Sequence, residues 1–391
     1  MCNCSTNLIV AGSELRLFAT NGQQLTTDNH PRMPDHNQEQ PPKRTDVNEL
    51  GEFGLIDHLT QNFPLCNPSS LKGIGDDAAV IDNGNLLTVV STDLLVEGIH
   101  FDLMYSPLKH LGYKSIVVNL SDIYAMNAHP KQVTVSIALS NRFAVEALEE
   151  LYAGIRAACE YYQVDLVGGD TTSSPRGLII SVTAIGQGEK EKLAYRNGAK
   201  VGDLICISGN LGAAYLGLQI LEREKQLYLS DPNIQPDLEG QDFLIGRILK
   251  PEARKDMIEM FAKNKLVPTA MIDISDGLSS DLLHIYQQSG VGAIIEESGV
   301  PIHPDAQLQA INFQLDPITC ALSGGEDYEL LFTIHPNDID KVKYLPDIYI
   351  AGEIVAATEG VKLHTKGGNI HDIKAQGWQH FGLSKPEGEQ G

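Results

Sequence analysis

Acidic residues recur beside glycine, serine or threonine at six separate points, and this pattern constrains the fold more than any other feature of the sequence. The first point is GIGDDAAV at 73–80, and the others are STD at 91–93, LSD at 120–122, GGDTT at 168–172, DISDG at 273–277 and GGEDY at 324–328. Neighbouring carboxylates repel one another unless a cation lies between them. Glycine lets the backbone turn tightly and approach a ligand closely. The sequence therefore predicts that distant loops assemble into one acid-rich site.

The residue types in this pattern favour magnesium and phosphate chemistry. The candidate acids are Asp76, Asp77, Asp93, Asp122, Asp170, Asp273, Asp276, Glu326 and Asp327. Carboxylate and hydroxyl oxygens without a matching set of His and Cys suit Mg²⁺ better than Zn²⁺. Mg²⁺ commonly links carboxylates to substrate phosphates, and the amide groups of Gly-rich turns bind phosphate oxygens. We therefore expect several Mg²⁺ ions that hold a nucleoside triphosphate for phosphoryl transfer.

Each motif also has a simpler structural explanation. A single aspartate ahead of a helix is more often an N-cap than a metal ligand, and Asp276 is the clearest example. Six acid-bearing loops in one chain are harder to explain as caps. The chain has no Walker A motif, no protein-kinase signature and no nucleophile elbow, so use of ATP would require another scaffold.

The charge balance limits the partners that this chain can bind. Its 391 residues include 51 acidic and 29 basic side chains, and the formal net charge is −22. This excess argues against a nucleic-acid or anionic-membrane partner, which would need basic patches. No apolar run reaches the roughly 20 residues that span a bilayer. The six cysteines do not form a disulfide framework, so a reducing cytoplasm is the expected location.

The length predicts two domains, and the composition predicts that the first 50 residues belong to neither of them. Residues 21–48 are rich in polar residues and proline, so we expect 1–50 to be a disordered N-terminal extension. The stretch 186–202 is rich in glycine and charge, which is typical of a boundary. We therefore expect one domain at 51–190 and a second at 191–385.

Hydrophobic periodicity predicts alternating strands and helices in both domains. Strands are expected at 79–81, 86–90, 133–139, 164–167, 178–185, 204–207, 270–274 and 328–334. Helices are expected at 107–127, 145–162, 241–249, 252–264 and 278–288, and another follows residue 210 and ends near 224. Asp93 would then lie just past a strand end, Asp170 just after a strand, and Ser275 or Asp276 at a helix N-cap.

The order and spacing of the motifs resemble the thiamine-monophosphate kinase family, within the superfamily of aminoimidazole ribonucleotide synthetase. The resemblance covers about residues 51–383 and includes GIHF at 98–101, RNGA at 196–199 and GWQHF at 377–381. It implies a two-domain α/β (α+β) fold. The N-terminal mixed-sheet domain would bind ATP and Mg²⁺ and dimerise through its strands, and an α+β domain would follow. It also implies direct, Mg²⁺-assisted transfer of the γ-phosphoryl group of ATP to thiamine monophosphate, the last step of thiamine diphosphate biosynthesis.

Motif matching to this family implies roles for individual residues. The implied Mg²⁺ ligands are Asp77, Ser91, Thr92, Asp93, Asp122, Asp170, Asp273 and Asp276. The implied contacts to ATP are Gly169, Arg196 and Ser275, and the implied contacts to thiamine monophosphate are His100, Glu326 and Trp378. The family more often has tyrosine at the position of Trp378, and either ring can stack on the substrate. No catalytic general base is expected, because a phosphate acceptor is already ionised at neutral pH.

Two alternatives stay open. The first is another ATP-dependent member of the superfamily, such as a purine-pathway synthetase, a selenophosphate synthetase or a hydrogenase-maturation protein. A selenophosphate synthetase would need a reactive cysteine in a Gly-rich loop, and Cys66 in LCNP does not suit that role. The second alternative is a nucleotide- or metal-binding module without catalysis, which Mg²⁺ would stabilise without any turnover of ATP.

Overall fold

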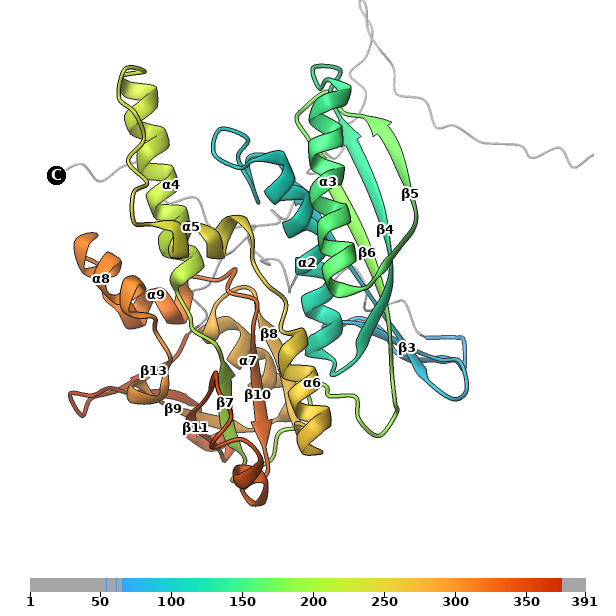
Figure 1. Ribbon diagram of the computed structural model, residues 1–391. Helices are drawn as coiled ribbons and strands as arrows, with labels where there is room; N and C mark the ends of the chain where they lie inside the picture. The colour runs from blue at the N-terminus through green and yellow to red at the C-terminus, as the bar shows by residue number, and fades with distance from the viewer. Residues whose placement is uncertain (1–53, 55–60, 62–64, 375–391) are drawn as a thin grey trace, which may run out of the picture. The chain divides into compact units, whose positions relative to one another are not determined.

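Two β-sheets form the framework of the computed structural model, which describes residues 54, 61 and 65–374 (Figure 1). The first sheet has six strands in the order β1-β2-β3-β6-β4-β5, and only the β4–β5 pair is parallel. Two long helices accompany it. In chain order the elements are β1 (Ser70–Lys72), β2 (Ala79–Asp82), β3 (Leu87–Val96), α2 (Leu108–Ala125), β4 (His129–Leu139), α3 (Val145–Tyr162), β5 (Asp165–Ser173) and β6 (Ile179–Gly188).

Helices α2 and α3 pack against one face of the first sheet (Figure 1). In β6, Ile180, Val182 and Ala184 point to this face and are fully buried, whereas the residues between them are only partly buried. The helices approach each other closely at two glycines. A Cβ atom at Gly112 would lie 1.9 Å from a carbonyl oxygen of α3, and one at Gly154 would lie 1.8 Å from a carbonyl oxygen of α2. Any larger residue would push the helices apart.

The second sheet has seven strands in the order β13-β12-β9-β11-β7-β10-β8, and only the β12–β9 pair is parallel. Six helices and three short 3-10 helices connect its strands. The strands are β7 (Leu204–Ser208), β8 (Ala270–Ile274), β9 (Gly292–Glu296), β10 (Glu329–Ile334), β11 (Ile348–Val355), β12 (Val361–His364) and β13 (Ile370–Asp372). The helices are α4 (Ala213–Ser230), α5 (Asp242–Leu249), α6 (Lys255–Asn264), α7 (Leu278–Ser289), α8 (Pro304–Asn312) and α9 (Pro317–Ser323).

The central strands of the second sheet are buried on both faces, which explains their unbroken apolar sequences. Along β10, Leu330 and Phe332 join the core that also contains α6, α2 and the first sheet, whereas Leu331 joins the core around α7. Side chains alternate between the faces of a strand, so β10 contributes to both cores. Because one core is shared by both sheets, the residues of 65–374 belong to a single compact unit. The domain limits at 51–190 and 191–385 stay a prediction, and 1–50 lies outside the described residues.

The elements predicted from periodicity are confirmed, but α4 continues to Ser230, past the end expected near 224, and several site residues lie differently. Asp93 lies inside β3, because this strand continues to Val96. Gly169 and Asp170 lie within β5 rather than in a loop after it, since glycines are accommodated where this edge strand pairs with β4. Neither Ser275 nor Asp276 caps α7: the N-cap is Gly277, and no side chain there accepts a hydrogen bond.

None of the described helices has an apolar stretch long enough to cross a membrane. The four cysteines in the described part of the chain are free. Cys206 and Cys320 are buried and Cys159 is half-buried, as expected for small core residues, and Cys66 is exposed.

Candidate active site

Three carboxylates meet where α2 contacts strands of both sheets. Asp77 lies two residues before β2, Asp122 lies in the last turn of α2, and Asp273 lies in β8. Each offers an oxygen, and these three oxygens lie within 4.8 Å of one another. Asp77 and Asp273 are buried and Asp122 is half-buried. The structure thus brings together three predicted site residues from three distant parts of the chain, which we name the acid cluster.

Neighbouring polar groups fix the orientation of these carboxylates. The hydroxyl of Ser121 donates a hydrogen bond of 2.6 Å to Asp273 Oδ2. The hydroxyl of Ser91 donates to Asp122 Oδ2. The α2 segment that contains Ser121 and Asp122 is therefore bound to β3 of the first sheet and to β8 of the second. Sequence reasoning quoted Ser121 within its motif but gave it no role.

A half-buried arginine neutralises one side of the acid cluster. Arg196 Nε and Nη2 donate to Asp77 Oδ2 and Oδ1 at 3.1 and 2.8 Å, a bidentate pair. The backbone of Arg196 is also held, because its carbonyl oxygen accepts a 2.9 Å hydrogen bond from the hydroxyl of Ser289. Burial alone would lower the pKa of Arg196, but Asp77 raises it above the usual value, so this residue is a permanent cation.

The remaining charge of the acid cluster is uncompensated. Burial, followed by Asp77, raises the pKa of Asp273 to about 8. Burial also raises the pKa of Asp122 well above its usual range, and Asp93, Asp273 and Asp77 raise it further. Burial raises the pKa of Asp93 to about 6. These carboxyls are held close together at an energetic cost that a bound cation would relieve. Oxygen donors of this kind fit Mg²⁺.

A second pair of acids lies next to the cluster. Asp281 in α7 is buried and accepts a 3.1 Å hydrogen bond from the backbone amide of Gly277. Burial raises its pKa well above the usual range, and Asp276 and Asp273 raise it further. The structure therefore places Asp276 near the cluster, together with an acid that sequence reasoning missed. The signal was an acidic residue in the first turn of α7 that is followed directly by Leu282 and Leu283.

Two predicted metal ligands lie on the other face of the first sheet. Thr92 lies between Ser91 and Asp93 in β3, is exposed, and donates its hydroxyl to the carbonyl oxygen of Val182 at 2.9 Å. Asp170 is exposed in β5, where Oδ1 accepts a 2.8 Å hydrogen bond from the amide of Thr171. Strands β6 and β4 separate β3 from β5. The structure does not bring Thr92 or Asp170 into the acid cluster.

Gly169 shows why this part of β5 is glycine-rich. Its φ is 153°, and a Cβ atom there would lie 1.8 Å from the carbonyl oxygen of Val135 in β4. Only glycine allows the two strands to approach this closely. The predicted ATP contact thus lies beside Asp170 on an exposed edge strand.

The predicted substrate contact Glu326 lies on a strained loop. Its φ is 57°, and the neighbouring Gly325 and Tyr328 also have positive φ values, of 70° and 52°. The amide of Glu326 donates a 2.7 Å hydrogen bond to the carbonyl oxygen of Ser275, which joins two predicted site loops. Its Oε2 accepts a 3.0 Å hydrogen bond from Nζ of Lys114 in α2. Non-glycine residues rarely adopt such a conformation unless the surrounding structure enforces it.

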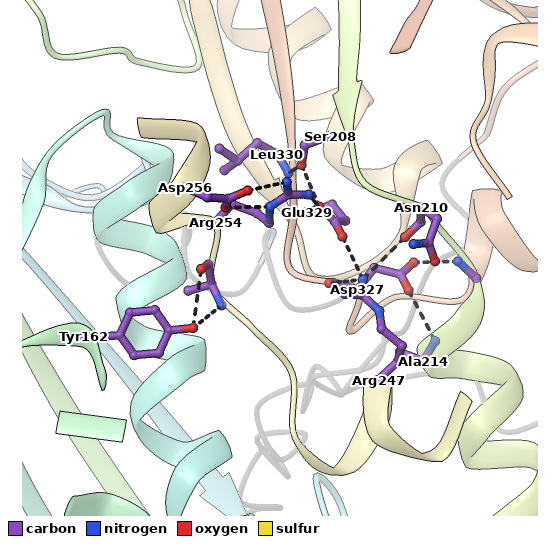
Figure 2. A network of polar contacts seen from close by, with 12 residues as sticks. Tyr162, Ser208, Asn210, Ala214, Arg247, Arg254, Asp256, Asp327, Glu329 and Leu330 are labelled. Atoms are coloured by element: carbon purple, nitrogen blue, oxygen red, sulfur yellow. Dashed lines mark hydrogen bonds and ion pairs between the residues drawn. The ribbon is translucent and has the colours of Figure 1, made fainter. Parts of the chain in front are cut away.

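Buried charges behind this loop hold it in place (Figure 2). Glu329 Oε2 accepts a 2.6 Å hydrogen bond from Ser208 and is also paired with Arg254, and Oε1 accepts a 3.0 Å bond from Arg247. Asp327 accepts a 2.7 Å hydrogen bond from the backbone amide of Gly212, which precedes α4. Each acid thus has a donor or cation partner, as buried carboxylates require. The network fixes the chain directly after Glu326.

The two other predicted substrate contacts are His100 and Trp378. Nδ1 of His100 accepts a 3.0 Å hydrogen bond from the amide of Val96, so the ring closes the turn after β3. If the ring is neutral, this bond leaves the proton on Nε2. Trp378 lies outside the described residues.

Comparison with known proteins identifies the family. The family described as AIR synthase related protein, N-terminal domain, matches residues 75–187. The thiamine-monophosphate kinase of Aquifex aeolicus is 35% identical over 335 residues, which cover 86% of this chain and 99% of that enzyme. The thiamine-monophosphate kinase of Buchnera aphidicola subsp. Schizaphis graminum is 37% identical over 85% of this chain and 99% of its own length.

A solved structure agrees with these sequence relatives. The structure described as AaThiL complexed with AMPPCP and TMP superposes with a TM-score of 0.74 and 34% identity, covering 86% of this chain and 99% of that one. Similar sequence along nearly the full length of the relatives is thus matched by the same mixed α/β fold. The chain belongs to the thiamine-monophosphate kinase family.

Proposed function

We propose that this chain transfers the γ-phosphoryl group of ATP to thiamine monophosphate, giving thiamine diphosphate and ADP. The observation that carries the proposal is the acid cluster, in a chain whose relatives are thiamine-monophosphate kinases along nearly their whole length. Both substrates are phosphate anions, so their approach requires positive charge between them. Oxygen ligands gathered within 4.8 Å supply a place for that charge.

Several residues would hold Mg²⁺ in this reaction. Support is strongest for Asp77, Asp122 and Asp273, since their oxygens already converge. Ser91, Asp93 and Asp276 are supported as well. Ser91 donates a hydrogen bond to Asp122, Asp93 raises the pKa of Asp122, and Asp276 raises the pKa of the neighbouring Asp281. Thr92 and Asp170 would act from the opposite face of the sheet. Bound Mg²⁺ would neutralise charge on the transferred phosphoryl group.

The remaining assigned residues would bind the two substrates. Arg196 is a permanent cation beside the acid cluster and suits the polyphosphate of ATP, together with Gly169 and Ser275. Glu326 suits the positive charge of the thiazolium ring, and His100 and Trp378 would contact the same molecule. The acceptor is ionised at neutral pH, so no side chain needs to remove a proton from it.

A homodimer formed through the first sheet is part of this proposal. The face opposite α2 and α3 exposes Leu94 in β3, with 52% of its surface accessible, and the edge strand β5 is exposed along its length. A second copy would cover this face and protect the edge. We keep the cytoplasm as the expected location, because the described cysteines are free.

The test is to incubate the purified full-length protein with ATP and thiamine monophosphate, with and without Mg²⁺, and to separate the products by chromatography. We expect thiamine diphosphate and ADP in equal amounts, and only with Mg²⁺. Release of ADP without thiamine diphosphate would favour another ATP-dependent member of the superfamily. A rise in Tm with Mg²⁺ and ATP but no turnover would favour a binding module.

A further inference from the structure

Lys114 is a buried cation to which the proposed mechanism has so far given no role. It lies in α2, where its neighbours Tyr113, Ser115 and Ile116 are all buried, and its own side chain is only 6% exposed. Removing an ammonium group from water is costly unless a partner compensates its charge. The compensating charge is Glu326, at 3.0 Å from Nζ.

The two partners of this ion pair differ in their access to solvent. The side chain of Glu326 is 30% exposed, five times the fraction for Lys114. The pair therefore meets solvent on the glutamate side. The backbone of Glu326 is fixed by its positive φ and by its amide hydrogen bond to Ser275, but its carboxylate lies at the end of a flexible side chain. A ligand that enters from solvent would meet the carboxylate first and the ammonium group behind it.

Lys114 and the acid cluster share one stripe of α2. Ser121 is seven residues after Lys114, which is two helical turns, so both side chains lie on the same face, roughly 10 Å apart along the axis. Ser121 binds Asp273 of the acid cluster. The helix thus presents a cation at one end of this stripe and carboxylates for Mg²⁺ at the other. A phosphate group located between them would contact positive charge on both sides.

We propose that Lys114 binds the phosphate of the acceptor after exchanging Glu326 for it, while Glu326 turns to the cationic thiazolium ring. This inference rests on the proposed function, because it assumes an acceptor with one cationic and one anionic end. Each charge of the ion pair then meets the opposite charge of the substrate. Neither Lys114 nor Glu326 is left buried without a partner at any stage, which makes the exchange energetically feasible.

The inference is tested with ligands that do and do not carry the phosphate. Binding of thiamine monophosphate and of thiamine is measured by calorimetry for wild type, Lys114→Met, Lys114→Arg and Glu326→Gln, in parallel with kcat and KM. Lys109→Met is the matched control, because Lys109 is an exposed lysine of the same helix. Thiamine lacks the phosphate of thiamine monophosphate. If Lys114 contacts this phosphate directly, Lys114→Met weakens only thiamine monophosphate, whereas loss of support for Glu326 would weaken both ligands.

We expect Lys114→Met to weaken binding of thiamine monophosphate by about 10- to 100-fold, the size expected for one charge-assisted hydrogen bond, and to leave thiamine binding within about 2-fold. Lys114→Arg should restore part of the loss, Glu326→Gln should weaken both ligands, and Lys109→Met should change neither. The KM for ATP should stay constant in Lys114→Met.

Three results would overturn the inference. Equal weakening of thiamine and thiamine monophosphate in Lys114→Met would mean that Lys114 only supports Glu326. A double variant Lys114→Met/Glu326→Gln no weaker than Glu326→Gln alone would mean the same. Unchanged binding in Lys114→Met would exclude any role. Turnover of the wild-type protein is measured before any variant. If it makes no thiamine diphosphate from thiamine monophosphate, the proposed function itself fails.

Discussion

Replacing Asp122 by asparagine should make the metal-free protein more stable and at the same time inactive. Asp122 is held near Asp77 and Asp273, with all three oxygens within 4.8 Å, and its pKa is raised by burial and by these neighbours. Asparagine has nearly the same shape but carries no charge. The substitution therefore relieves repulsion that only a bound cation relieves in the wild-type protein.

The size of the effect follows from the distances. Two carboxylates 4.8 Å apart repel each other by about 3.5 kcal/mol at an effective dielectric constant of about 20. Protonation and Arg196 remove part of this repulsion, so we expect a net gain of about 1–3 kcal/mol in the free energy of unfolding. For a chain of this length that corresponds to an increase of about 1–4 °C in Tm.

The assay is thermal unfolding of both proteins with and without Mg²⁺, together with turnover. Mg²⁺ at 100 times its Kd should stabilise the wild-type protein by about 2.7 kcal/mol, and should stabilise Asp122→Asn much less. The variant should thus have the higher Tm without Mg²⁺ and lose this advantage with Mg²⁺. Turnover should fall by about 1,000-fold or more, because the reaction depends on charge neutralisation.

Three results would refute this reasoning. An equal rise in Tm with Mg²⁺ in both proteins would show that Asp122 is not a ligand, and wild-type turnover in the variant would do the same. A lower Tm of the metal-free variant would show that the carboxylates do not repel one another as calculated. Asp372→Asn provides the control, because Asp372 is an exposed residue of β13 and should behave as wild type.

Three further outcomes are expected from single substitutions. Gly154→Ala should lower the free energy of unfolding by about 1–3 kcal/mol in a urea titration, because its Cβ would lie 1.8 Å from a carbonyl oxygen of α2. Gly246→Ala is the control: a Cβ there would have no atom within 4 Å, so this variant should raise the free energy of unfolding by up to about 1 kcal/mol. Arg196→Met should cost about 3–5 kcal/mol without Mg²⁺, because the buried Asp77 loses its cation partner, and Mg²⁺ should restore part of this loss. Burial raises the pKa of Asp327 to about 6, so its protonation stabilises the folded state below pH ~4, and this contribution is lost as the pH rises through about 6. The stability of wild type relative to Asp327→Asn should therefore fall between about pH 4 and 6.

Each of these outcomes has a contradicting result. Equal stability of the two alanine variants would mean that α2 and α3 can move apart freely. An Arg196→Met protein as stable as wild type without Mg²⁺ would mean that the acid cluster tolerates an unpaired Asp77. A stability difference at Asp327 that is constant with pH would mean that this carboxyl titrates alike in both states.

Periodicity alone predicted most of the secondary structure, because the apolar faces of these elements are strongly marked. The helix expected at 145–162 is α3, Val145–Tyr162, and the strand expected at 270–274 is β8. Strand ends were less predictable. Asp93 was expected outside its strand, yet β3 continues to Val96 because Leu95 is still part of the core. A polar residue does not end a strand when the neighbouring strand continues to pair with it. Here β6 pairs with β3 from Leu87 to Val96.

Lys114 shows a different limit of sequence reasoning. The motifs that predicted the site consist of acids beside glycine, serine or threonine, whereas Lys114 lies among apolar residues of a helix. Its partner Glu326 is 212 residues away, and no local pattern connects the two. The available signal was the helix itself, since 14 of its 18 residues are buried and a lysine among them requires a compensating charge.

The sequence could not show which of the predicted metal ligands can share one ion. This depends on the face of the first sheet on which each residue lies. Ser91 and Asp93 point toward α2, so Thr92 between them points away, and residues directly opposite one another on paired strands share a face. Asp170 lies on the same face as Thr92, and the three strand spacings between β3 and β5 amount to about 14 Å. Side chains of Asp170 and Asp122 therefore cannot ligate one ion within a single protomer. If both bind Mg²⁺, as the family motifs imply, they bind different ions.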